Sequence, residues 1–222
     1  MSKRFKPRDL DENTYPGTRS QREWLAQNLD PLVEGEWIDD LLYTVKSGKE
    51  ATVYCCAASP SSGTDLLAAK VYRPFRARAM VNDALYREGR DVRDERGKVI
   101  RDPRRRRAAS KSAYGRQLQM PSWIEHEYET LCLLHDAGVD VPAPYAQSGY
   151  TILMEYLGDE ETPAPMLNRV RLAPDQAGPL FAQLMANVEL MLACGWVHAD
   201  LSPLTSSIGS ASPRSSICRR PS

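Results

Sequence analysis

Hydrophobic and polar positions change their period along the chain, and these changes predict the order of its elements. Residues 20–30 carry apolar side chains at helical spacing, with Ser20 as the expected N-cap. Over residues 37–59, β-branched and aromatic residues flank a polar centre that contains glycine, which predicts strand, turn and strand. Residues 66–74 read as a third strand, reached through a short hairpin loop.

In the second half of the chain, apolar residues recur at helical spacing in two segments. A helix is expected from a cap at Ser122 to a stop at Gly138, followed by two short strands within residues 140–159. Residues 173–195 predict an amphipathic helix that is interrupted near Pro179. A small sheet followed by helices indicates an α+β chain.

Two segments lack this patterning. Residues 1–20 are polar and rich in turn formers, so we expect a flexible leader. Residues 76–118 are highly charged with few apolar anchors, which indicates a flexible, solvated insert. The alternative is a basic surface at Arg101–Arg107 for RNA, a ribosome or an acidic partner. No aromatic residues interleave these arginines, so nothing there supports base stacking.

Composition narrows the class of protein only modestly. The 222 residues include 29 Lys and Arg against 29 Asp and Glu, so overall charge favours no partner. No apolar stretch approaches the ~20 residues of a membrane span, and no secretory signal is recognisable. The five cysteines form no C-x-x-C pair. This pattern predicts reduced thiols in a cytoplasmic protein, rather than disulfides or a zinc site.

Two lysines suggest phosphate chemistry. The loop that begins at Ser47, "SGKEATVY", combines a glycine that allows close backbone approach with the charge of Lys49, although such hairpins are common. Lys70 lies among strand-forming residues, as the lysine that grips the α- and β-phosphates does in nucleotide kinases. Its expected partner is Glu127 in the next helix, because the alternative, Glu125, lies off the buried face.

A hinge is suggested by "YTILMEYLGD". An apolar strand ends at the bulky Met154, and backbone groups at Glu155 and Leu157 could bond an adenine edge. A buried strand followed by an ordinary turn explains this segment equally well when it is taken alone.

The H-x-D of "VHADLSP" is the strongest single signal. In phosphotransferases the aspartate accepts or orients the substrate hydroxyl and the histidine braces the loop, roles that fall to Asp200 and His198. H-x-D is common by chance, but here it follows a long helix and the earlier segments in order.

Together, "SGKEATVY", "AAKVYRP", "WIEHEYETLCLLHDAGVDVPAPY", "LMEYLGD" and "VHADLSP" resemble the RIO family of atypical serine/threonine protein kinases, most of all its type-one branch. The resemblance implies a bilobal protein-kinase-like fold, with a small β-rich N-lobe over residues 21–153 and the hinge and start of an incomplete helical C-lobe over 154–203. It also implies use of ATP and Mg²⁺, with Asp200 as base and His198 beside it. The implied ATP-binding residues are Ser47, Gly48, Lys49, Glu50, Ala51, Val53, Lys70, Glu127, Met154, Glu155 and Leu157.

The last segment departs from that family. Thr205 stands where the family has a metal-binding Asn, and no Asp, Glu or Asn follows Asp200, so Mg²⁺ would be poorly held and no metal ligand is identifiable. Back-translated and read one base out of frame, residues 204–209 can encode N-I-L-Y-W and residues 215–222 can encode I-D-L-P-Q-A-I, both of which are family motifs. We hypothesise a single-base shift near codons 201–204, which would leave a poorly soluble protein with impaired phosphoryl transfer. Resequencing the gene across codons 198–225 tests this.

Two other functions remain open from the sequence. One is a small-molecule phosphotransferase of the aminoglycoside type, which also uses H-x-D, although the K-E-A-x-V-Y loop speaks against it. The other is a non-catalytic protein that binds nucleotide, RNA or the ribosome. No protein substrate can be named from these residues.

Overall fold

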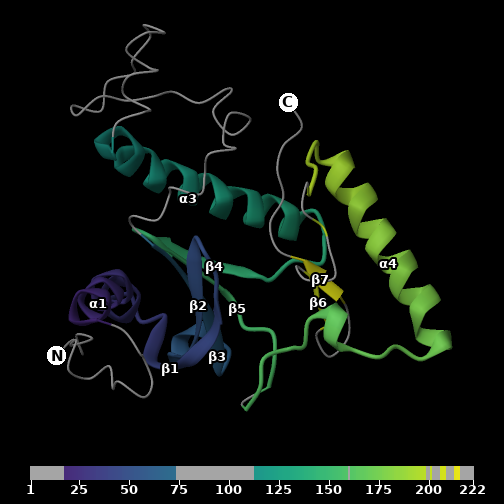
Figure 1. Ribbon diagram of the computed structural model, residues 1–222, viewed down its shortest axis with the longest axis horizontal. Helices are drawn as coiled ribbons and strands as arrows, with labels where there is room; N and C mark the ends of the chain where they lie inside the picture. The colour runs from purple at the N-terminus through teal and green to yellow at the C-terminus, as the bar shows by residue number, and fades with distance from the viewer. Residues whose placement is uncertain are drawn as a thin grey trace, which may run out of the picture.

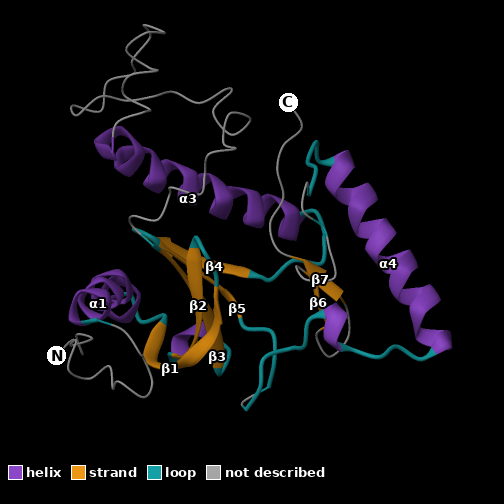
Figure 2. Ribbon diagram, viewed as in Figure 1, coloured by secondary structure: helices purple, strands orange, loops and turns teal. Residues whose placement is uncertain are grey.

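The computed structural model describes residues 18–73, 113–159, 161–198, 201, 206–208 and 213–215. A helix, three strands, a helix, two strands and a helix follow one another in the predicted order, whereas the short strands β6 and β7 were not predicted (Figures 1 and 2). The elements are α1 (Arg19–Glu34), β1 (Ile38–Ser47), β2 (Ala51–Ala58), η1 (Pro60–Ser62), β3 (Leu66–Tyr72), α3 (Ala113–Asp136), β4 (Pro144–Ser148), β5 (Thr151–Glu155), η4 (Leu167–Arg169), α4 (Pro174–Ala193), β6 (Ser206–Ile208) and β7 (Pro213–Ser215).

Five strands form one antiparallel sheet in the order β1-β2-β3-β5-β4. The three predicted strands of the first half and the two around the turn at 149–150 are all present. β3 is the central strand, and its Lys70 pairs with Val53 on one side and Ile152 on the other. The lysine therefore lies in the middle of the sheet, with a neighbouring strand on each side. β6 and β7 form a separate two-stranded sheet.

The two faces of the sheet pack against different helices. Successive side chains of a strand point to opposite faces. Leu67, Ala69 and Val71 of β3 accordingly join a buried cluster with α1. Tyr72, on the other face, joins Ile124 and further apolar residues of α3. Lys70 lies on the same face as Tyr72, and this face therefore carries the candidate chemistry.

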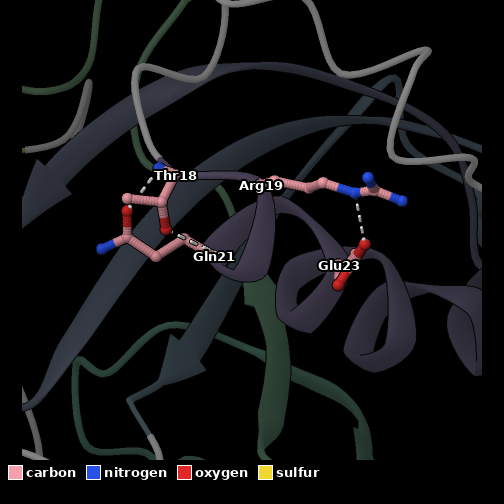
Figure 3. A network of polar contacts seen from close by, with 4 residues as sticks. All are labelled: Thr18, Arg19, Gln21 and Glu23. Carbon is pink, nitrogen blue, oxygen red and sulfur yellow. Dashed lines mark hydrogen bonds and ion pairs between the residues drawn. The ribbon is translucent and has the colours of Figure 1, made fainter.

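The N-terminus of α1 is fixed by a capping box (Figure 3). The Thr18 hydroxyl accepts the Gln21 backbone N–H at 3.3 Å, and the Gln21 side-chain oxygen accepts the Thr18 N–H at 2.7 Å. The expected N-cap at Ser20 is therefore wrong by two residues. Ser20 also has an acidic residue three positions later, Glu23, but that carboxylate pairs with Arg19 instead. Arg19 and Glu23 add an exposed ion pair at 2.9 Å on the first turns.

α3 is longer than its hydrophobic pattern indicates. It begins at Ala113 rather than at Ser122, so the end of the predicted insert is helical, and the rest of that insert lies outside the described residues. From Trp123 onward apolar side chains pack against the sheet, with Ile124 and Leu131 fully buried. The hydrophobic pattern on which the prediction relied also begins at Trp123.

α4 runs through Pro179 without interruption, contrary to prediction. Pro179 is the sixth residue of α4 and removes one bond of the helical ladder, that to the Asp175 carbonyl. Both residues are exposed, so water can replace this bond. The helix is attached through Asn187 and Met191, while its other face exposes large apolar side chains such as Phe181. Within the described part of the chain, the helices are too short or too polar to cross a membrane.

Candidate nucleotide-binding site

The predicted pair of Lys70 and Glu127 is present. The Lys70 Nζ lies 2.5 Å from the Glu127 Oε1 and donates a hydrogen bond to it, joining the central strand to α3. The Glu127 side chain is only 9% exposed and that of Lys70 23%. Glu125, the alternative, points to solvent. An ammonium group is thus held partly exposed on the sheet face by a buried carboxylate, an arrangement that fits the binding of an anion.

An apolar patch lies beside Lys70 on the same face. It is formed by Val45, Val53, Ala68 and Met154, which pack with the buried Cys55. Ala68 lies two residues before Lys70 and pairs with both Cys55 and Met154 across the neighbouring strands. These side chains are apolar, and such a surface suits the face of an aromatic ring. Val53 and Met154 were predicted; Val45 and Ala68 were missed, although strand alternation counted from Lys70 and Val53 could have found Ala68.

Two tyrosine hydroxyls close one end of the patch. Tyr43 of β1 and Tyr156 share a hydrogen bond of 2.7 Å, and their rings meet edge to face. Burial raises the pKa of both phenols, and burial likewise raises the pKa of the Cys55 thiol. All three groups are consequently neutral near pH 7, so the patch carries no charge and favours an uncharged base.

The loop between β1 and β2 is pinned by a residue that the sequence did not suggest. Arg73 donates its backbone N–H to the Glu50 oxygen at 2.9 Å. Its Nη2 donates to the Ser47 hydroxyl at 2.6 Å and to the Thr52 hydroxyl at 3.0 Å. The remaining predicted loop residues behave as a tight hairpin: the Gly48 N–H donates to the Ala51 oxygen at 2.9 Å, and Lys49 and Glu50 are exposed. Lys49 is therefore free to reach an anion.

The segment after β5 offers one unused backbone donor. The Glu155 N–H bonds to the Ala143 oxygen at 2.7 Å, and the Glu155 carboxylate accepts the Ala143 N–H at 3.0 Å. The Leu157 carbonyl accepts the Ala164 N–H at 2.8 Å. The Leu157 N–H has no such bond to any residue that the structure describes. Of the two predicted backbone positions, Leu157 thus supplies the available donor.

His198 lies just beyond α4 and is buried, with 7% of its surface exposed. The nearby Trp196 is also buried, and its ring lies 5.6 Å from that of His126 on α3. The end of α4 is thereby packed onto the helix that carries Glu127. The predicted base Asp200 falls outside the described residues, as do Thr205 and Arg101–Arg107.

The described residues do not form a metal site. No group of three His, Cys, Asp or Glu side chains among them is placed to hold an ion. Among the described residues, the carboxylates therefore do not form a set that fits Mg²⁺.

A comparison with known families decides the relationship, because residues 67–204 match the RIO domain. The chain belongs to the RIO domain family. The match includes the β3 lysine, α3, the hinge segment and the H-x-D motif, and it ends one residue beyond the predicted boundary at 203.

Similar proteins of known name support membership of the same family. The chain is 28% identical over 200 residues to serine/threonine-protein kinase RIO1 of Caenorhabditis elegans, covering 83% of this chain and 34% of that protein. It is 28% identical over 193 residues to RIO1 of Homo sapiens, covering 83% and 31% respectively. The chain thus spans about a third of the length of these relatives.

The fold is also that of solved RIO kinases. The Rio2 kinase of Chaetomium thermophilum, in an ADP/Mg²⁺-phosphoaspartate complex, superposes with a TM-score of 0.59 over 87% of this chain and 52% of that one, at 19% identity. The predicted α+β, protein-kinase-like fold is confirmed.

Proposed function

We propose that this chain binds ATP on the sheet face around Lys70 and is the catalytic region of a RIO-type serine/threonine protein kinase, of the type-one branch. The observation that carries the proposal is the ion pair of Lys70 with the buried Glu127 beside a neutral apolar patch. The cation suits phosphate, the patch suits adenine, and both lie on one face of one sheet. The names of the similar kinases support the same assignment.

The roles of the residues follow from their positions. The adenine ring lies against Val53 and Ala68 and accepts the Leu157 N–H. Lys70 neutralises the α- and β-phosphates, because Glu127 keeps its ammonium in place. Lys49, at the tip of the hairpin, adds charge near the phosphates. These residues bind and orient the nucleotide.

Transfer of the γ-phosphoryl group requires, in addition, the two residues of the H-x-D motif. The substrate hydroxyl oxygen forms a bond to the γ-phosphorus as the bond from that phosphorus to the β,γ-bridging oxygen breaks, which releases ADP. The hydroxyl proton passes to a base, which the motif assigns to Asp200. His198, buried two positions earlier, holds the loop that carries this base.

Nucleotide binding is measured first, by calorimetry with the 222-residue protein and with ATP and adenosine in parallel. We expect Lys70→Met and Glu127→Gln to weaken ATP binding at least tenfold, about 1.4 kcal/mol, while adenosine binding changes little. Glu125→Gln is the matched control, since this exposed neighbour lies on the same helix. Failure of the unaltered protein to bind ATP would overturn the proposal.

Transfer is measured second, as ADP formation and incorporation of γ-phosphate into protein. Turnover that is abolished by Asp200→Ala supports a kinase. ATP binding with no turnover under any condition contradicts the catalytic half of the proposal and favours a nucleotide-binding protein instead.

A further inference from the structure

The ring of Tyr72 contacts both elements that carry the Lys70–Glu127 pair. Tyr72 is the last residue of β3 and lies two positions after Lys70, so both side chains occupy one face of the sheet. The Lys70 Nζ lies over the tyrosine ring, 5.1 Å from its centroid. That distance is within the ~6 Å of a cation–π interaction, and Tyr72 is only 1% exposed, so the contact is shielded from water.

The same ring reaches α3 on its other side. It meets the ring of Trp123 edge to face, with centroids 5.0 Å apart and planes at 88°. Trp123 and Glu127 are four residues apart on a continuous helix and therefore share a face. A shift of the tyrosine ring would thus move the helix face that presents the carboxylate as well as the surface beneath the ammonium.

The backbone of Tyr72 is tied down by elements outside the site. Its N–H donates to the Tyr150 oxygen at 2.8 Å, and its carbonyl accepts the Trp24 indole N–H at 3.2 Å. Trp24 also packs on Tyr150, with ring centroids 4.8 Å apart. Through Trp24, α1 on the opposite face of the sheet holds the end of β3.

We infer that Tyr72 is a positioning residue for the Lys70–Glu127 pair, and that α1 belongs to the nucleotide-binding machinery because it fixes Tyr72 through Trp24. The inference rests on the proposed function for its effect on ATP, but its effect on the lysine does not depend on nucleotide. The aromatic ring is the part of Tyr72 that matters, since both contacts are made by the ring face and edge.

A set of variants distinguishes the effect of the Tyr72 aromatic ring from the effect of losing buried apolar packing. Tyr72→Phe keeps the ring, whereas Tyr72→Leu keeps apolar bulk without it. Tyr54→Leu is the matched control: Tyr54 is equally buried in the neighbouring strand, but it packs in the α1 cluster on the face away from Lys70. Trp24→Phe keeps an aromatic ring next to Tyr150 but removes the indole N–H that holds the Tyr72 carbonyl, together with the pyrrole part of the ring.

Two readouts are measured on each variant of the whole chain: the rate at which an amine-reactive reagent labels Lys70, followed by mass spectrometry against pH, and the affinity for ATP. We expect Tyr72→Leu to change the Lys70 labelling rate and to weaken ATP binding by about tenfold, a size typical of a shielded cation–π contact. Tyr72→Phe should stay within about twofold of the unaltered protein. Trp24→Phe should move both readouts in the same direction as Tyr72→Leu.

The inference is overturned if Tyr72→Leu and Tyr54→Leu give the same labelling profile. Should Tyr72→Leu fail to fold, Trp24→Phe decides: an unchanged labelling profile overturns the inference and a changed one supports it. If Tyr72→Leu changes the Lys70 labelling rate but the unaltered protein binds no ATP, the proposed function is overturned and the positioning role of Tyr72 is still supported.

Discussion

The Lys70 ammonium and the Glu127 carboxylate are buried to different degrees, 23% exposed for the lysine side chain and 9% for the glutamate. Removing the lysine therefore leaves an unpaired carboxylate that is almost inaccessible to solvent. Removing the carboxylate leaves an ammonium group that water can partly hydrate. We expect Lys70→Met to lower the free energy of unfolding by about 3 kcal/mol and Glu127→Leu by less. Urea titration measures both.

The double variant separates stability from function. Lys70→Met with Glu127→Leu leaves no unpaired charge, so its urea midpoint should recover most of what Lys70→Met loses, while ATP binding should stay at least tenfold weaker than in the unaltered protein. A double variant that binds ATP like the unaltered protein would show that the pair is structural only.

The attachment of α4 depends on Asn187. Its side-chain oxygen accepts the Asp140 N–H at 2.9 Å, and its Nδ2 donates to the Asp140 carboxylate at 2.8 Å; Gln183 donates to the same carboxylate at 2.9 Å. Asn187 is only 7% exposed. Asn187→Asp should lower stability at pH 7 by about 2–3 kcal/mol, because it replaces a donor with a second carboxylate. Gln183→Glu makes the comparable exchange at a more exposed position and should be milder. Equal losses would contradict this account.

The elements that the sequence predicted best are those with a local period. Strands β1 to β5 and the burial of Leu131 follow from alternation and helical spacing, and Lys70 stands out because a charge has little reason to lie within an apolar strand. Arg73, by contrast, gains its contacts with Ser47 and Thr52 only through the register of three strands. The residues next to Arg73 in the sequence do not determine that register, so these contacts could not be predicted from them.

The helix ends show the same limit. Thr18 and Ser20 are both acceptable caps by residue type, and each has a Gln or Glu three positions later, so their local sequence does not decide between them. For α3, the apolar periodicity on which the prediction relied begins at Trp123, ten residues after the helix begins at Ala113. Tyr72 was missed as part of the site because aromatic residues in strands are usually core, and its neighbours Lys70 and Trp123 are 53 positions apart in the chain.

The turn after β5 requires glycine at position 158. Gly158 has a φ of 155°, and a Cβ there would collide with the Thr162 carbonyl and lie 2.7 Å from the Tyr156 hydroxyl. Gly158→Ala should lower the free energy of unfolding by about 1–3 kcal/mol and weaken nucleotide binding, since Leu157 precedes it. Gly178→Ala is the control, because no atom lies near its Cβ position on α4, and it should stabilise by about 0.5–1 kcal/mol. A neutral Gly158→Ala variant would refute the steric argument.

Stability should fall at alkaline pH because of buried thiols. Burial raises the pKa of Cys56, and also that of Cys55 and Cys132. Their unfolded pKa is about 8.5, so above this pH the unfolded chain loses protons that the folded chain retains. The linked stability is fully present below about pH 8.5 and is lost as pH rises, by up to about 1.4 kcal/mol per pH unit for each buried thiol. Urea midpoints between pH 7 and 10 measure this slope. Cys56→Ala should flatten it, and an unchanged slope in that variant would assign the effect to other groups.

Substitutions on the two faces of α4 should differ in their effect on stability, with a large loss on the buried face and almost none on the exposed face. Met191 is 2% exposed and packs with Leu131 and Trp196, whereas Phe181 is 65% exposed and Leu192 55% exposed. Met191→Ala should lower the free energy of unfolding by about 2–5 kcal/mol, because it removes buried apolar surface and leaves a cavity. Phe181→Ser should change it by no more than about 0.5 kcal/mol, and solubility should rise because an exposed apolar side chain is lost. Urea titration and the protein concentration at which light scattering begins measure the two effects. Strong destabilisation by Phe181→Ser would show that this face of α4 is covered in the folded protein.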